Sequence, residues 1–338
     1  MPKAIFDKKN VLVLGGAGFI GSHLCEELLR ESKVICVDNF ISSTRSNIEH
    51  LLKNPNFILL KHDIIEPLLL ENLSELDAFN LKFQGIQEVY NLAIPMNPKD
   101  FEQVKIQTLL ANSYGTKNAL DLALKYKAKL FHASSAVVYG ERIDEHTLFA
   151  EDYVGALNQF SPRSNYDLGK KFSESMVYHY NQAYGVDGRI GRIFRTYGPR
   201  TPLGKGHMIP DFIVSALRGE DLVIYGNENF TTTLVYVSDV VDAILRQIKL
   251  DQNIGAVNIG TDVLIRLVDV CGQIIRKTNS NSKIRFEPTL LFMSELGIPD
   301  ITRAREKLGW LPIMTLDKGL DKAIEYTLAH EVLLGVNR

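Results

Sequence analysis

The first half of the chain alternates short apolar runs with longer segments of helical character. The apolar runs cover Asn10 to Leu14, Lys33 to Val37, Phe57 to Leu60, Glu88 to Leu92, Lys129 to His132 and Arg189 to Phe194. A run without alternating polar positions, such as Val11 to Leu14, indicates a strand buried on both faces. Because such strands belong to parallel sheets with helices on either side, the pattern predicts a doubly wound α/β fold of the Rossmann type.

This alternation of apolar and helical segments ends after about residue 195. The following stretch is rich in glycine and proline, from Tyr197-Gly198-Pro199 to Pro210, and then gives way to shorter amphipathic segments. Such breakers predict loops rather than further strand-helix units. We therefore expect a first domain over residues 1–195, to which residues 234–260 return, and a smaller second lobe formed by residues 196–233 and 261–338.

The composition is that of an ordinary globular protein of enzyme size, with 338 residues, 45% hydrophobic and 23% charged. A formal net charge of -2 gives no reason to expect nucleic acid or a membrane surface as partner. The three cysteines form no C-x-x-C pair and the eight histidines lack metal-ligand spacing, so neither a disulfide framework nor a metal site is predicted. No run approaches the ~18 apolar residues of a membrane span, and a cytoplasmic location is expected.

A glycine-rich turn directly follows the first predicted strand. Gly16, Gly18 and Gly21 form G-x-G-x-x-G, a helix is predicted from Ser22 to Arg30, and Asp38 closes the next strand. Glycines at these positions allow a tight turn and let backbone N–H groups approach a diphosphate at the helix N-terminus. A carboxylate at position 38 accepts hydrogen bonds from ribose hydroxyls and repels a 2′-phosphate. The motif therefore predicts a dinucleotide site that favours NAD over NADP.

Tyr166 and Lys170 lie four residues apart in a segment, 166–184, that is predicted to be helical, so their side chains share one face. An unperturbed phenol has a pKa near ~10, and a neighbouring ammonium lowers it by ~1 to 3 units. Ser135 follows the predicted fifth strand, at the sheet edge where ligands of open α/β folds bind. We therefore predict that Tyr166 transfers a proton, with Lys170 lowering its pKa and Ser135 positioning a substrate oxygen.

Together these motifs resemble the extended short-chain dehydrogenase/reductase family, in particular its NAD-dependent nucleotide-sugar epimerases, dehydratases and decarboxylases. The resemblance covers nearly the whole chain and also includes His62-Asp63, Asn91-Leu92-Ala93, Arg192-Ile193-Phe194, Tyr197-Gly198-Pro199-Arg200, Tyr236-Val237-Ser238-Asp239 and Leu308-Gly309-Trp310. It implies a tightly held NAD that takes a hydride from C4 of the sugar while Tyr166 takes the hydroxyl proton. In its overall sequence the chain looks most similar to UDP-glucuronate decarboxylases.

The resemblance also implies roles for individual residues. Ser135, Tyr166 and Lys170 are the expected catalytic residues, and Lys170 is expected to bind the nicotinamide ribose. Asp63 is expected at the adenine. The complete set of expected cofactor-binding residues is Gly15, Gly18, Phe19, Ile20, Gly21, Asp38, Asn39, Asp63, Ile64, Leu92, Ala93, Ser134, Tyr166 and Lys170.

One departure from the family pattern concerns the chemistry. Decarboxylases and 4,6-dehydratases of this family carry a carboxylate two residues before the tyrosine of the Val-Tyr-Gly turn, and this chain has Val137 there. Because a valine cannot move a proton, the sequence favours a 4-epimerase, in which the keto sugar rotates and takes the hydride back. UDP-glucuronate decarboxylation and NDP-sugar 4,6-dehydration are the alternatives.

A second departure concerns the substrate lobe, where several arginines that hold the diphosphate in the family are replaced. The corresponding positions carry His207 and Thr232, and Arg195 stands where the family has an asparagine. Charge-assisted bonds from arginine contribute strongly to phosphate binding, so other cations are expected to substitute. The predicted substrate-binding residues are Arg195, Arg200, His207, Thr232 and Arg266, with Lys205 as a further candidate.

Other interpretations stay open. The missing arginines are compatible with a net oxidoreductase that uses free NAD(H) on another substrate, and a non-catalytic dinucleotide-binding protein is a further alternative. Arg45 lies close enough in sequence to the predicted cofactor site for NADP to stay an alternative cofactor. A UDP-sugar is the favoured substrate. The resemblance also implies a homodimer that associates through helices 108–125 and 166–184.

Overall fold

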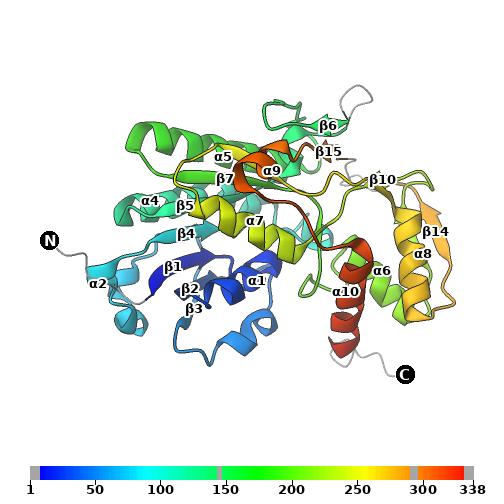
Figure 1. Cartoon of the computed structure of the whole chain (residues 1–338), viewed down its shortest axis with the longest axis horizontal. Helices are drawn as coiled ribbons and strands as arrows, with labels where there is room; N and C mark the ends of the chain where they lie inside the picture. Colours follow the sequence, from blue (N-terminus) through cyan, green and yellow to red (C-terminus); the bar gives the residue numbers. More distant parts are fainter. Residues whose placement is uncertain (1–7, 143–146, 290–295, 331–338) are drawn as a thin grey trace.

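The centre of the protein is a seven-stranded parallel sheet in the order β12-β7-β5-β4-β1-β2-β3 (Figure 1). The computed structural model describes residues 8–142, 147–289 and 296–330. The strands are β1 (Lys9–Leu14), β2 (Ser32–Asp38), β3 (Phe57–Lys61), β4 (Glu88–Asn91), β5 (Lys129–Ser135), β7 (Gly188–Ile193) and β12 (Ala256–Ile259). All neighbouring strands pair in parallel.

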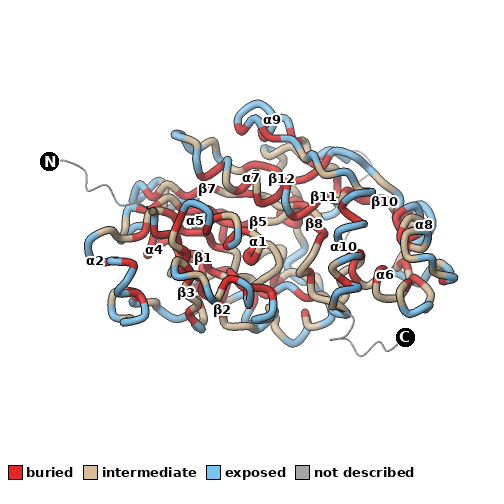
Figure 2. The backbone as a smooth tube through the Cα atoms, turned by 60° about the horizontal axis from the view of Figure 1, so that its bottom comes forward, coloured by how far each residue is buried: buried red, intermediate tan, exposed pale blue. Residues whose placement is uncertain are grey.

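The apolar runs form strands because both faces of the sheet are covered. Val11 and Val13 of β1 pack in one hydrophobic cluster, whereas Leu12 and Leu14 pack in the other. Successive side chains of a strand point to opposite faces, so an apolar run without alternation is buried on both sides. Figure 2 shows the central strands as buried. The predicted α/β fold is confirmed, and each of the six predicted strands is present. The seventh, β12, was not predicted as a strand.

Helices cover both faces of the sheet. One face carries α1 (Phe19–Leu28) and α7 (Val237–Lys249), which pack against each other. The other face carries α3 (Lys105–Leu110), α4 (Thr116–Tyr126) and α5 (Ser164–Tyr184). A π-helical turn, η5 (Ala111–Gly115), joins α3 to α4, so the predicted helix over 108–125 is one helix with a bulge.

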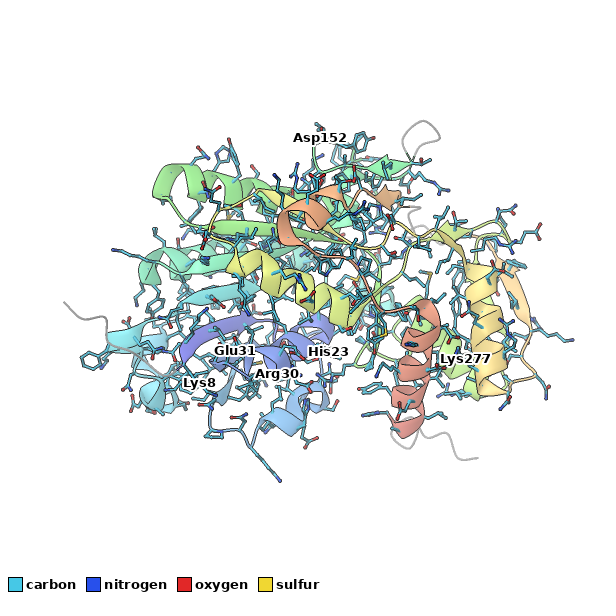
Figure 3. All side chains as sticks on the ribbon, viewed as in Figure 1. Lys8, His23, Arg30, Glu31, Asp152 and Lys277 are labelled. Carbon is cyan, nitrogen blue, oxygen red and sulfur yellow. The ribbon has the colours of Figure 1, made fainter. Side chains whose placement is uncertain are left out.

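A second group of elements lies at one end of the molecule, beyond the sheet (Figure 1). Its helices are α6 (Met208–Leu217), α8 (Leu267–Thr278) and α10 (Leu316–His330), and α6 contacts both of the others. Lys277 of α8, labelled in Figure 3, forms ion pairs with Asp317 and Asp321 of α10. Two strands, β9 (Leu222–Tyr225) and β14 (Ile284–Glu287), pair in parallel beside these helices.

The remaining elements are short. Two-residue strands pair as β6 (Leu148–Phe149) with β15 (Ile298–Pro299), β8 (Thr196–Tyr197) with β11 (Val235–Tyr236), and β10 (Thr231–Thr232) with β13 (Ile265–Arg266). Short helices are α2 (Leu81–Gln84), α9 (Thr302–Leu308) and the 3₁₀ turns η1 (Arg45–Leu51), η2 (Leu70–Asn72), η3 (Ser74–Phe79), η4 (Pro98–Asp100) and η6 (Ala136–Tyr139).

The chain crosses between the two groups of elements more than once. After β7 it leaves the sheet, and α7 and β12 bring it back, because α7 packs on the sheet face and β12 pairs with β7. The proposed division into 1–195 with 234–260, and 196–233 with 261–338, stays a prediction. Among the described residues, no helix has the length and apolar composition that crossing a bilayer requires.

Candidate active site

A cavity of about 640 Å³ lies between the carboxyl ends of the parallel strands and the second group of elements. Gly15, Gly18, Asp38 and Asp63 line one end of it, and Tyr225 lines the part formed by the second group. This is the edge at which open α/β sheets bind their ligands. Every residue predicted to bind the cofactor, and each of the three predicted catalytic residues, lines this cavity. Their roles stay predictions.

The glycine turn has the geometry that a dinucleotide diphosphate needs. Gly15 has φ +78°, and a Cβ at Gly21 would lie 2.1 Å from the carbonyl oxygen of Gly15. Among the described residues, no side chain caps α1 at Gly18, and its first turn contains no acidic residue. The first N–H groups of the helix therefore point to the cavity without a competing carboxylate, which fits an anionic diphosphate. The helix begins at Phe19 rather than at Ser22 as predicted.

Asp38 is held in place before any ligand binds. Its carboxylate accepts hydrogen bonds from the backbone N–H of Ala17 and Phe40, each 2.9 Å long, and from the hydroxyl of Ser43 at 2.7 Å. A carboxylate offers about four acceptor positions, so capacity remains for a ribose hydroxyl. Asn39 donates to the Asp63 carboxylate at 2.9 Å, which fixes the neighbouring wall. The residues therefore fit the adenosine half of NAD.

Tyr166 and Ser135 meet on the cavity wall. Burial raises the pKa of Tyr166 to about 12, while a hydrogen bond with the Ser135 side chain and the positive charge of Arg163 act in the opposite direction. Lys170 lies 5.8 Å from the centre of the Tyr166 ring. The prediction that Lys170 lowers the phenol pKa is therefore not supported, because the groups that lower it are Ser135 and Arg163.

Lys170 is buried next to the Tyr166 ring. Its ammonium donates to the backbone carbonyl of Ala133, with 2.5 Å between Nζ and the oxygen. Burial lowers the pKa of Lys170 to about 7, and the Glu174 carboxylate opposes this shift. An ammonium has three donors and only one is used here, so Lys170 retains donors for a ribose hydroxyl.

Two of the predicted substrate-binding residues line the cavity. Arg195 donates to the Thr232 hydroxyl at 2.7 Å and its guanidinium lies 5.8 Å from the Phe230 ring centre. His207 pairs with the Asn97 side chain at 3.3 Å, and burial lowers its pKa to about 4. His207 is therefore neutral near pH 7 and contributes a hydrogen bond rather than a charge.

The other predicted substrate-binding residues lie outside the cavity lining. Arg200 pairs with Glu26 of α1 at 2.5 Å, and Thr232 acts as the acceptor for Arg195. Arg266 is exposed and pairs with Asp269. Lys205 pairs with Asp100 at 3.0 Å. These positions do not support direct contact with a diphosphate, because each side chain lies outside the cavity lining and is bonded to another side chain.

Sequence reasoning missed Arg163, which also lines the cavity. It lies three residues before Tyr166, donates to Asp167 at 3.2 Å and is 16% exposed at its side chain. Its place at the start of α5, one turn before the predicted base, was the available signal. Val137 and Phe101 pack with Tyr166 in one small cluster, so the wall beside the phenol is apolar.

These features are those of an α/β protein whose cavity, at the carboxyl edge of a parallel sheet, is lined by a glycine turn, a tyrosine and a serine. A family model described as the NAD dependent epimerase/dehydratase family matches residues 11–260. The chain belongs to this NAD-dependent family, whose members act on nucleotide sugars as epimerases, dehydratases or decarboxylases.

Comparisons with individual proteins agree on the family and differ in the reaction named. The chain is 37% identical to UDP-glucuronic acid decarboxylase 1 of Danio rerio over 95% of its length and 73% of the relative. UDP-glucose 4-epimerase of Thermotoga maritima, solved with UDP-glucose, is 27% identical with a TM-score of 0.82, covering 95% and 99% of the two chains. UDP-glucuronic acid 4-epimerase of Bacillus cereus, solved with UDP-glucuronic acid and NAD, is 26% identical with a TM-score of 0.81 and the same coverage.

Proposed function

We propose that the protein oxidises C4 of UDP-glucuronic acid transiently and then releases the C5 carboxylate as carbon dioxide. The observation that carries the first step is the meeting of Tyr166 and Ser135 on a cavity wall that also holds the glycine turn and Asp38. In this arrangement a sugar hydroxyl would lie beside a nicotinamide ring. The substrate assignment is supported by relatives whose names specify UDP-glucuronic acid.

In the proposed first step the C4 hydroxyl gives its proton to the Tyr166 oxygen while its carbon gives up a hydride. Bound NAD supplies the hydride acceptor. The Ser135 hydroxyl positions the sugar oxygen, and the positive charge of Arg163 favours the phenolate. The product would be a 4-keto sugar with the proton on Tyr166. After carbon dioxide leaves and C5 takes up a proton, the hydride would return from the bound cofactor to C4, so the net reaction consumes no oxidant.

A carboxylate on the substrate has a cationic partner in Arg163. This guanidinium lies on the cavity wall, and its charge acts on the Tyr166 phenol. C5 neighbours the carbon that is oxidised beside that phenol, so a C5 carboxylate comes within the field of the same cation. Charge-assisted bonds between arginine and carboxylate are among the stronger hydrogen bonds in proteins. We therefore propose that Arg163 selects the uronate over a neutral sugar.

Decarboxylation needs fewer acid and base groups in the site than dehydration does. A β-keto acid loses carbon dioxide when its C–C bond electrons move into the ketone, so no base is needed at C5. A 4,6-dehydration needs a base for the C5 proton and an acid for the departing C6 hydroxyl. Val137, at the position of the expected carboxylate, performs neither role. The site therefore supports decarboxylation better than dehydration, in line with the names of the relatives.

The 4-epimerase expected from the sequence is the second candidate, and the apolar wall of Val137 and Phe101 favours it. After loss of carbon dioxide, C5 must take up a proton, and neither Val137 nor Phe101 carries an acidic group that could donate it. Epimerisation needs only that the keto sugar rotates and takes the hydride back. The two reactions share the substrate and the first step, so one experiment separates them.

The test is incubation of the purified protein with UDP-glucuronic acid, with the product analysed by mass spectrometry and proton NMR. Loss of carbon dioxide with formation of a UDP-pentose is the expected result. Unchanged mass with inverted C4 stereochemistry would replace decarboxylation by epimerisation. Absence of turnover with UDP-glucuronic acid, but turnover of another UDP-, dTDP-, GDP- or CDP-sugar, would overturn the substrate assignment.

We also propose a homodimer formed through helices 108–125, which span α3, η5 and α4, and 166–184, which lie in α5. The segment 105–126 and α5 expose large apolar side chains that packing within one chain leaves uncovered: Ile106, Leu109, Tyr114, Leu124, Phe172, Tyr178 and Tyr184. An apolar surface on two neighbouring helices favours a second pair of helices as its cover. Sedimentation at micromolar concentration tests this, and a monomer would contradict it.

A further inference from the structure

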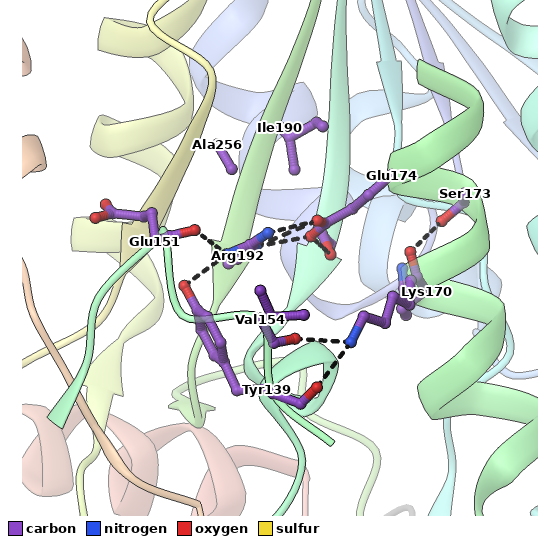
Figure 4. Close-up of polar contacts among 12 residues, drawn as sticks. Tyr139, Glu151, Val154, Lys170, Ser173, Glu174, Ile190, Arg192 and Ala256 are labelled. Carbon is purple, nitrogen blue, oxygen red and sulfur yellow. Dashed lines mark hydrogen bonds and ion pairs between the residues drawn. The ribbon is translucent and has the colours of Figure 1, made fainter. Parts of the chain in front are cut away.

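A buried ion pair lies directly behind the proton-transfer residues. Glu174 follows Lys170 by one turn on α5 and is 10% exposed at its side chain. Its carboxylate accepts from Nε and Nη2 of Arg192 on β7, at 3.0 and 2.8 Å, and from the hydroxyl of Ser134 on β5, at 2.5 Å. Figure 4 shows Arg192 extending from its strand to Glu174 on the helix.

Arg192 is held from its other side as well. It donates to the Tyr139 hydroxyl at 2.8 Å and to the Glu151 carbonyl at 2.9 Å (Figure 4). Tyr139 in turn donates to Asn258 on β12 at 2.7 Å. Charged groups this deeply buried are costly unless they are paired and hydrogen-bonded, and here both are. The network therefore joins α5, β5, β7 and β12 at one point.

Two features connect this network of hydrogen bonds to the candidate active site. Ser134 precedes Ser135 on β5, and in the sheet Ser134 pairs with Arg192. Glu174 is one turn from Lys170 and its negative charge favours the ammonium form of that lysine. The same carboxylate thus fixes the strand end that carries Ser135 and faces the charge of Lys170.

We propose that Glu174, held by Arg192, is a positioning residue that keeps Lys170 in its charged form and in place for the cofactor. It does not touch the substrate. Because an ammonium donates more hydrogen bonds than a neutral amine and attracts the anionic dinucleotide, its charge strengthens cofactor binding. The inference rests on the proposed role of Lys170.

The other groups that face Lys170 do not supply this charge. His132 on β5 is fully buried, and burial together with the nearby Lys170 lowers its pKa well below the usual value, so it is neutral. It pairs with the side chains of Asn91 and Ser173, which carry no charge. On α5 the ring of Tyr166 lies beside Lys170, and burial raises the pKa of its phenol to about 12. Among the described groups around Lys170, Glu174 therefore supplies the negative charge.

The test follows NADH binding by fluorescence from about pH 6 to about pH 9, a range that includes the titration of Lys170. In the unaltered protein, affinity declines as pH rises through about 7, and Lys170→Met removes that part of the decline. Glu174→Gln is expected to move the decline to lower pH by about one unit, which at pH 7 reduces affinity roughly fivefold. Glu174→Asp retains the charge and is expected to keep the midpoint near that of the unaltered protein.

A purely structural role for Glu174 predicts a different result. It would lower the melting temperature or the affinity at every pH without moving the midpoint, and that outcome would overturn the proposal. Should Glu174→Gln fail to fold, the double variant Glu174→Gln with Arg192→Gln removes both charges of the buried pair, so that no unpaired cation is left. A shift of the midpoint to lower pH is expected there as well, and an unmoved midpoint refutes the proposal. Because no sugar is needed, failure of UDP-glucuronic acid turnover is a separate result.

Discussion

Replacing Arg163 by glutamine tests the uronate assignment most directly. The guanidinium lies on the cavity wall and is 16% exposed, so solvent screens it only in part. A hydrogen bond to a charged group contributes about 1.5 to 3 kcal/mol, which corresponds to roughly a 10- to 150-fold loss of kcat/KM with UDP-glucuronic acid. A further loss in kcat is expected because the charge of Arg163 lowers the pKa of Tyr166.

A neutral substrate and a second variant separate these effects. UDP-glucose has a hydroxymethyl group in place of the carboxylate and can undergo only the C4 oxidation, so Arg163→Gln should affect that step, followed by the absorbance of bound NADH, only through Tyr166. The same change leaves the half-buried Asp167 without one of its donors. The double variant Arg163→Gln with Asp167→Asn removes that unpaired carboxylate and serves as the control for stability. Equal losses with both sugars would refute a contact between Arg163 and the substrate carboxylate.

Three further changes have defined outcomes. Tyr166→Phe removes the proton acceptor and should lower kcat by about 10² to 10⁴ while the absorbance of bound NAD is unchanged; full activity would reject its role. Gly21→Ala would place a Cβ 2.1 Å from the Gly15 carbonyl oxygen, so the turn must move and the purified protein should lose its NAD; normal NAD content would contradict this. Burial raises the pKa of Asp167 to about 6, so this carboxyl group stabilises the fold at low pH and that contribution is lost as pH rises from about 4 through about 6. Asp167→Asn should therefore raise the melting temperature more at pH 7 than at pH 4, and an equal effect at both would exclude the shift.

The site was partly predictable because some of its residues belong to local motifs. Gly15 to Gly21 and Asp38 follow consecutive strands of one βαβ unit, so their meeting at the carboxyl edge is a consequence of the local fold. Tyr166 and Lys170 share one helix. By contrast, Arg200 and Arg266 were expected at the cavity, but each is paired elsewhere with a carboxylate, Glu26 and Asp269 respectively. The spacing of residues along the chain does not reveal such ion-pair partners.

The sequence by itself determined the parallel sheet and the glycine turn, and it placed Tyr166 and Lys170 on one helix, because each depends on residues close together in the chain or on burial on both faces of a strand. Only the tertiary structure decided what surrounds the phenol. Burial raises its pKa while Ser135 and Arg163 oppose that shift, whereas the expected partner Lys170 bonds to a carbonyl oxygen and feels the negative charge of Glu174. The physical reason is that pKa values depend on distance and desolvation, which arise from packing between elements far apart in sequence.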